Sequence, residues 1–130
     1  METGGTATIS LADVAGTWNG TVTAAGSDTV LTVIELTATA DPTGWTMKVA
    51  NAKTPTEMTT VPAQSVVAAG DSVVVEAGPF ASVLRPGQQV TTHTVYRLQD
   101  GRLMGSIQAT YPASGETIAL RSVATRAVPK

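Results

Sequence analysis

The regular spacing of turn-forming residues is the feature that most restricts the fold of this chain. Glycine and proline clusters recur at short intervals, and the segments between them are rich in threonine and valine. Both residue types are β-branched and fit the pleated surface of a sheet. No segment shows a sustained apolar period of 3.6 residues, so the best helical candidate is one short turn over residues 9–14, with Ser10 as its cap. The sequence therefore predicts an all-β protein.

Alternation of apolar and polar residues divides the chain into eight expected strands. They span residues 16–25, 29–40, 44–50, 59–68, 71–77, 89–99, 102–111 and 116–125. In the seventh of these, Leu103, Ile107 and Tyr111 share one face, which we expect to be buried. The pair Asp100-Gly101 separates two alternating strands and is typical of a tight hairpin turn.

The expected connections differ in length in an ordered way. Tight turns follow the second, fourth and sixth strands, at residues 41–44, 69–71 and 99–101, whereas long links over residues 51–58 and 78–88 follow the third and fifth. Alternate connections of an up-and-down meander lie at the same end, so one closed end and one end with larger loops are expected. This pattern favours an eight-stranded antiparallel up-and-down barrel, with a β-sandwich as the alternative.

Composition excludes several classes of function. The chain has no cysteine, which rules out disulfides and thiolate metal sites. His93 is the only histidine, so a site with several histidine ligands is also excluded. The net charge is −2, with only 14% charged residues, so a basic nucleic-acid-binding face is not expected. We predict no metal and no cofactor.

The length of 130 residues fits one domain. We expect residues 1–12 to form a flexible leader or tether and residues 13–130 to form a single barrel domain. No apolar run approaches the roughly 20 residues that span a bilayer, and residues 1–6 lack the pattern of a signal peptide. Low charge and many threonines favour a mature secreted or periplasmic protein, with a cytoplasmic protein as the alternative.

The first expected strand carries a short motif. Gly16 and Trp18 form a Gly-x-Trp on the first strand of an eight-stranded meander, which resembles the lipocalin and avidin (calycin) superfamily. The resemblance implies a barrel whose closed end is covered by Trp18, with a basic residue of the last strand stacked on the indole. Arg126 is the expected partner because it lies nearer Trp18 and shares the parity of the inward residues; Arg121 is second.

The chain also departs from this superfamily. Lipocalins usually carry a helix beside the barrel, and none is expected here. Avidins line their pocket with several tryptophans, whereas this chain has only Trp18 and Trp45. Biotin is therefore not an expected ligand.

Catalytic residues are hard to assemble from this sequence. Any histidine-dependent chemistry requires His93, which we expect to point outward from its strand. Most acidic residues lie at expected turns, where Asp favours local backbone bonds. Glu35 and Glu76 stand within apolar strands and face either solvent or a polar interior. We therefore predict that the protein is not an enzyme.

The connection over residues 78–88 is the most unusual segment, because it holds the only phenylalanine between glycine and proline residues. At the open end of a barrel it forms either a plug that completes the core or the rim of a ligand site. The expected ligand-binding residues are Met58, Phe80, Leu84, Arg85 and Tyr111. The resulting hypothesis is non-enzymatic binding of a small, largely apolar ligand in the barrel mouth.

An alternative function follows from the second strand, which is apolar on both faces. Leu31 and Val33 lie opposite the expected core face, so the tether, the loop over residues 51–58 or another protein must cover them. A protein partner or a second copy of the chain is the sharper interpretation. The alternative is therefore a structural or protein-interaction module of an extracellular or periplasmic assembly, without a ligand.

Overall fold

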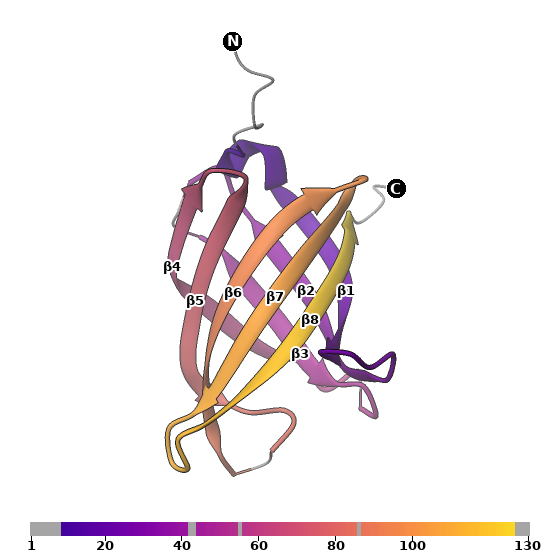
Figure 1. Cartoon of the computed structure of the whole chain (residues 1–130), viewed down its shortest axis with the longest axis vertical. Helices are drawn as coiled ribbons and strands as arrows, with labels where there is room; N and C mark the ends of the chain where they lie inside the picture. Colours follow the sequence, from indigo (N-terminus) through magenta and orange to yellow (C-terminus); the bar gives the residue numbers. More distant parts are fainter. Residues whose placement is uncertain (1–8, 42–43, 55, 86, 127–130) are drawn as a thin grey trace.

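The chain folds into a closed barrel of eight antiparallel strands (Figure 1). This computed structural model describes residues 9–41, 44–54, 56–85 and 87–126. The elements are η1 (Leu11–Val14, a 3-10 turn), β1 (Gly16–Ala24), β2 (Val30–Ala38), β3 (Thr46–Asn51), β4 (Thr59–Ala69), β5 (Ser72–Ala81), β6 (Gln89–Gln99), β7 (Arg102–Tyr111) and β8 (Glu116–Arg126). Each strand pairs with the next, and β1 pairs with β8. The predicted up-and-down barrel is confirmed, and the sandwich is excluded.

The two ends of the barrel have different connections, as expected. The β4–β5 and β6–β7 turns lie at one end, drawn uppermost in Figure 1, whereas the β5–β6 and β7–β8 connections lie at the opposite end. We call the first end the floor and the second end the mouth. In the β6–β7 turn, Asp100 and Gly101 both have positive φ, of 54° and 77°. This is the left-handed turn that suits a two-residue hairpin, so the hairpin prediction is confirmed.

Two predicted connections are wrong in extent. The link from β2 to β3 runs over residues 39–45 rather than being a tight turn, and its residues 42–43 lie outside the described part of the chain. Strand β5 does not end at Ala77 but continues to Ala81. A bulge after Ala77 interrupts the pairing with β6, which resumes at Phe80 opposite Val90. The alternation pattern did not predict the resumed pairing, because Gly78 and Pro79 interrupt it.

The bulge also changes which side chains of β5 face the core. Before it, Val73, Val75 and Ala77 point inward and are almost fully buried. An inserted residue reverses the inward–outward alternation of a strand. Phe80 therefore points inward beside Val90, where it packs against the core cluster.

The floor is closed by Trp18. Its side chain is 1% exposed, and its indole Nε1–H donates to the backbone oxygen of Val14 at 2.9 Å. The guanidinium carbon of Arg126 lies 4.3 Å from the ring centroid, and its nitrogens donate to the backbone oxygens of Asp13 and Ala15. Gly16 leaves the space for this arginine, since a Cβ there would lie 2.9 Å from Nη1 of Arg126.

A second tryptophan completes the floor. Trp45 is 2% exposed, and its Nε1–H donates to the backbone oxygen of Thr39 at 2.9 Å. Ile9 is also buried, and its amide donates to the backbone oxygen of Gly70 in the β4–β5 turn. Ile9 belongs to the segment expected to be a tether, so the described end of that segment packs on the floor instead. Residues 1–8 of the expected tether lie outside the described residues.

The barrel core follows the predicted alternation in most strands. In β7, Leu103, Ile107 and Tyr111 are buried on the inner face, as expected. Leu98, which shares the inward parity of Tyr96, is 38% exposed because it lies at the end of β6 beside the turn. Leu98 is therefore not part of the core, although its position in the alternation is that of an inward residue.

Candidate functional site

The connection between β5 and β6 extends across the barrel mouth; we call residues 82–88 the mouth loop. The side-chain amide of Asn51, at the end of β3, donates to the backbone oxygen of Val83 at 3.1 Å. Because β4 separates β3 from β5 in the barrel, this bond ties the loop to a strand that is not its neighbour. Backbone bonds from Ser82 to Gln88 and from Gln88 to Arg85 hold the loop compact.

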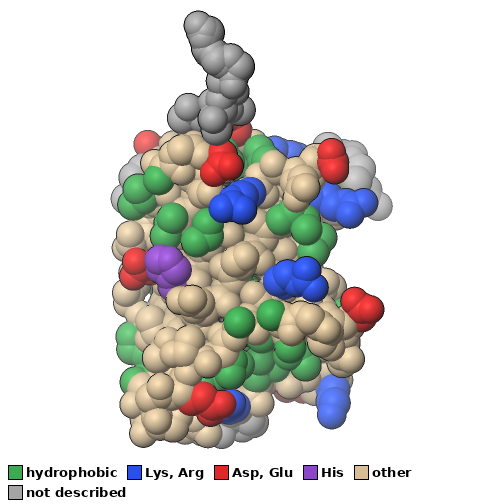
Figure 2. All heavy atoms as spheres, in the orientation of Figure 1, with side chains coloured by type: hydrophobic (Ala, Val, Ile, Leu, Met, Phe, Trp, Pro, Cys, Tyr) green, Lys and Arg blue, Asp and Glu red, His purple; other side chains and the backbone are tan. Residues whose placement is uncertain are grey.

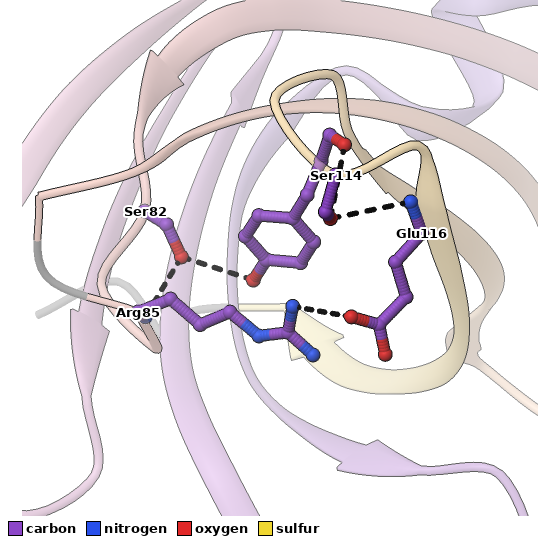
Figure 3. A network of polar contacts seen from close by, with 5 residues as sticks. Ser82, Arg85, Ser114 and Glu116 are labelled. Carbon is purple, nitrogen blue, oxygen red and sulfur yellow. Dashed lines mark hydrogen bonds and ion pairs between the residues drawn. The ribbon is translucent and has the colours of Figure 1, made fainter.

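A hydroxyl network fixes the start of the mouth loop to β7 (Figure 3). The Oγ of Ser82 lies 3.0 Å from the hydroxyl of Tyr111, and it accepts the amide hydrogens of Leu84 and Arg85. A hydroxyl oxygen has two lone pairs. Since both amides occupy them, Ser82 is the donor toward Tyr111. Ser82 is 8% exposed and Tyr111 is 1% exposed, so this bond lies inside the barrel.

Arg85 joins the mouth loop to the β7–β8 connection. Its guanidinium carbon lies 4.2 Å from the ring centroid of Tyr111, and its Nη1 donates to Oε1 of Glu116 at 2.7 Å (Figure 3). The arginine lowers the pKa of the Glu116 carboxyl through this hydrogen bond and through its charge. The backbone amide of Glu116 is held in turn by the Oγ of Ser114. Both charged groups are solvent-accessible, so salt weakens their attraction.

Beneath the mouth loop lies a cavity of about 80 Å³. Its lining is mainly apolar and comes from most of the strands. The main apolar contributors are Val22, Ile34, Met47, Phe80, Ile107 and Leu120. The mouth loop contributes Val83 and Leu84 to the lining of this cavity, which is partly open to solvent. The loop thus combines the two roles that the sequence left open, because it closes the barrel and also lines a space.

Three nearly buried side chains that line this cavity carry hydroxyl groups without a hydrogen bond to any described residue. They belong to Thr32, Thr94 and Tyr96, which are 5%, 4% and 1% exposed. Burial raises the pKa of Tyr96, so its hydroxyl stays protonated at neutral pH. Its ring packs over Gly105, where a Cβ would lie 2.9 Å from Cε1 of the tyrosine. Such groups normally find a partner in protein, ligand or water.

The structure brings together most of the predicted site residues. Phe80, Leu84 and Tyr111 line the cavity, and Arg85 stacks on Tyr111. Met58 does not take part: it lies in the β3–β4 connection, is 42% exposed and is not part of the lining. The structure therefore does not bring Met58 together with the other predicted site residues, because the mouth loop, and not this connection, lines the cavity.

Sequence reasoning missed the polar part of the site. Tyr96, Thr94 and Ser82 were not identified as binding residues, although the alternation of β6 already placed Tyr96 on the inner face. The sequence signal that could have identified Tyr96 was an inward-facing tyrosine opposite a glycine on the next strand. Tyr96 pairs with Gly105, and that pairing needs the β6–β7 register, which the Asp100-Gly101 turn sets.

The ionisable residues considered for catalysis point away from the cavity. His93 and Glu76 pair on the outer surface, with Nδ1 and Oε2 3.5 Å apart, and Figure 2 shows the purple histidine beside a red acidic side chain. Glu35 lies 3.8 Å from Nζ of Lys48 on an outer face. Acidic and basic side chains are scattered over the face drawn in Figure 2 rather than gathered in one patch.

The proposed partner surface on β2 is partly covered. Leu31 and Val33 are both half-buried, and Leu31 packs against the core cluster. The backbone oxygen of Leu31 accepts the amide of Ala52, which follows β3. The start of the β3–β4 connection therefore lies beside Leu31.

Comparisons with protein-family models, with curated proteins and with solved structures gave no significant match. Among residues 9–41, 44–54, 56–85 and 87–126, no helix is long and apolar enough to span a membrane. The same residues contain no group of three His, Asp or Glu side chains that could hold a metal ion.

Proposed function

We propose that this protein binds a small, largely apolar molecule inside the mouth half of the barrel and carries out no reaction on it. The observation that carries this proposal is the cavity beneath the mouth loop, which has a mainly apolar lining and several hydroxyls without a hydrogen bond to any described residue. Small-molecule sites in proteins are mostly apolar, with a few polar groups that fix orientation. The cavity has this composition.

The unequal filling of the barrel supports the proposal. At the floor, Trp18 and Trp45 occupy the interior and both indole N–H groups are bonded to backbone oxygens. The mouth half keeps an open space although it is built from the same strands. A protein interior normally packs with few voids larger than a water molecule. A partly open cavity of about 80 Å³ beneath the mouth loop is therefore consistent with a site for another molecule.

The volume limits the ligand. An engineered apolar cavity of about 150 Å³ takes up benzene or xenon. The cavity here is about 80 Å³, so a molecule of only a few non-hydrogen atoms fits without rearrangement. A larger ligand extends out of the open part of the cavity or displaces the mouth loop, which Arg85, Ser82 and Asn51 tie down through side chains.

Xenon tests whether the interior accepts a guest. We expect xenon-saturated buffer to shift the amide NMR signals of residues that line the cavity, because xenon is apolar and of suitable size. In the variant Ala109→Leu, which adds bulk to a lining residue that is 2% exposed, these shifts should disappear. Ala119→Leu, on the outer face of the adjacent strand β8, is the matched control and should keep them.

Two results would overturn the proposal. One is the absence of xenon-dependent shifts at the lining residues of the native chain. The other is shifts of equal size in Ala109→Leu, which would place the xenon elsewhere. Ala109→Val fills less space and replaces Ala109→Leu if the larger variant does not fold.

A further inference from the structure

We infer that the ligand of the barrel cavity is an uncharged molecule whose oxygen or nitrogen atom hydrogen-bonds the hydroxyl of Tyr96. This inference rests on the proposed function and defines the chemistry of its ligand. It follows from three features of the interior: the charge of the lining, the state of the Tyr96 hydroxyl and the rigidity of the Tyr96 ring.

The lining carries no ionisable group that could balance a charged ligand at neutral pH. Every described side chain around the cavity is apolar or bears a hydroxyl. The nearest charge that the site offers, on Arg85, lies over Tyr111 and is already paired with Glu116. Burying an ion without a partner loses its hydration and gains nothing in return. The cavity therefore selects against carboxylates and ammonium groups.

Tyr96 supplies the polar contact. Its side chain is 1% exposed and lines the cavity, and within the described part of the chain its hydroxyl makes no hydrogen bond. The other large buried aromatic side chains do not share this state. Trp18 and Trp45 donate to backbone oxygens, and Tyr111 is bonded to Ser82. Unlike the Oγ of Ser122, the Tyr96 hydroxyl keeps some accessible surface, so a ligand in the cavity can bond it without displacing a described protein partner.

The position of the Tyr96 ring is fixed by its neighbours. A Cβ at position 105 would lie only 2.9 and 3.0 Å from two carbons of the Tyr96 ring. It would also lie 3.3 Å from the Cγ2 of Thr94. Glycine at position 105 thus provides the space in which the ring rests. A ring held by packing presents its hydroxyl in one place, and such preorganisation reduces the entropic cost of binding.

Besides Ser82 and Tyr111, which are bonded to each other, and the half-buried Thr92, the polar part of the lining consists of Thr32 and Thr94. Their hydroxyls also lack a hydrogen bond to the described residues, and both side chains are nearly buried. A threonine hydroxyl hydrogen rotates to suit its partner. These two groups therefore accommodate more than one ligand orientation, whereas Tyr96 defines the main one.

Three molecules that share a tert-butyl group test the inference. They are tert-butanol, pivalate and tert-butylammonium, titrated at pH 7 against the isotope-labelled full chain by NMR. We expect the alcohol to shift the signals of cavity-lining residues and to bind at least about 10-fold more tightly than either ion. Equal binding of an ion at the same residues would overturn the inference.

Variants assign the hydrogen bond. Tyr96→Phe should weaken binding of tert-butanol by about 2- to 10-fold while leaving xenon-dependent shifts in place, since only the hydroxyl is lost. Ser122→Ala is the matched control: its Oγ, like the Tyr96 hydroxyl, has no described partner, but it is fully buried and Ser122 does not line the cavity. This control should leave the affinity for the alcohol unchanged.

The outcomes separate the two proposals. If xenon binds and Tyr96→Phe does not change the affinity for tert-butanol, the inference about Tyr96 is wrong and the binding function stands. If neither xenon nor tert-butanol reaches the lining residues, both proposals are wrong. Tyr96→Phe is expected to fold, because it removes only a hydroxyl that has no described protein partner.

Discussion

Each end of the barrel carries an arginine stacked on an aromatic ring, but the two arginines donate to different acceptors. At the floor, Arg126 stacks on Trp18 at 4.3 Å, and at the mouth, Arg85 stacks on Tyr111 at 4.2 Å. Arg126 donates to backbone oxygens of residues 13 and 15, whereas Arg85 donates to the carboxylate of Glu116. A backbone oxygen does not titrate near neutral pH, and a carboxylate does.

The two ends therefore differ in how firmly they are held: the contacts at the floor do not depend on a titratable acceptor, whereas the Arg85–Glu116 contact at the mouth does. The floor joins its arginine to the backbone and fills its interior with tryptophan rings. The mouth holds its loop with side chains that are solvent-accessible or that belong to distant strands. A site that admits a ligand needs one end that opens, and the contacts at the mouth are the ones that pH and salt can weaken.

The largest expected effect comes from the floor. Trp18→Ala should lower the free energy of unfolding by about 3–5 kcal/mol, because a nearly fully buried ring is replaced by a cavity. Urea denaturation measures this loss. The mouth counterpart is Phe80→Ala, which should cost less because Phe80 is only half-buried. Equal losses for the two variants would contradict the contrast between the ends.

Removing the floor arginine should have the next largest effect. Arg126→Gln loses a stack and two hydrogen bonds to backbone oxygens, which together stabilise the fold by about 1–2 kcal/mol. We expect a smaller loss for Arg85→Gln, and one that shrinks further at high salt because its partner is an exposed carboxylate. Denaturation at low and high ionic strength compares the two. If the loss for Arg126→Gln depended on salt more strongly than the loss for Arg85→Gln, the floor and not the mouth would be the end held by an exposed ion pair.

The hydroxyl bond at the mouth gives a third test. Tyr111→Phe leaves the hydroxyl hydrogen of Ser82 without its acceptor in a buried position, so we expect a loss of about 1 kcal/mol. Hydrogen exchange of the Leu84 and Arg85 amides, which donate to Ser82, should become faster. Ser122→Ala removes a hydroxyl without a described partner and should cause no loss. Unchanged exchange in Tyr111→Phe would show that Tyr111 does not hold the loop.

The smallest expected effect is a pH dependence confined to the mouth. Arg85 lowers the pKa of Glu116 below its ordinary value of 4.5 in the folded chain. The pair therefore stabilises the fold fully above pH 4.5, and this stabilisation is lost as the pH falls through the lowered pKa. The difference in thermal midpoint between the native chain and Glu116→Gln should be present at pH 7 and vanish in acid. A difference that persists in acid would mean that charge is not its cause.

Much of the fold was predictable because the barrel follows local rules. Alternation and turn residues identified all eight strands, and the Asp100-Gly101 turn fixed the β6–β7 register. The extension of β5 beyond Gly78 was not predictable, because the bulge depends on pairing with β6 that only the closed barrel supplies. The burial of Ile9 was missed for a similar reason: its amide bonds to Gly70, which is distant in sequence.

The candidate site was predictable only in part. The unusual composition of residues 78–88 pointed to Phe80, Leu84 and Arg85, and all three contribute to the mouth. The inferred role of Tyr96 could not be predicted from the sequence, because it depends on the lack of a described hydrogen-bond partner for its hydroxyl. No sequence pattern contains that information. Met58 lies apart from the cavity, because an apolar residue in a connection at the mouth does not reveal which connection lines the interior.

The pairing of β1 with β8 has a consequence for how the chain can be rearranged. Trp18 stands opposite Arg126 across this pair, so the first and last strands begin and end side by side at the floor. In a closed ring of strands, no strand is intrinsically first. A circularly permuted chain, with β8 linked to η1 and new ends placed in the β7–β8 connection, would keep every strand neighbour. Such a permutant would place its new ends beside Glu116, the partner of Arg85. It would therefore show whether the strands still close into a barrel when the contact that holds the mouth loop is disturbed.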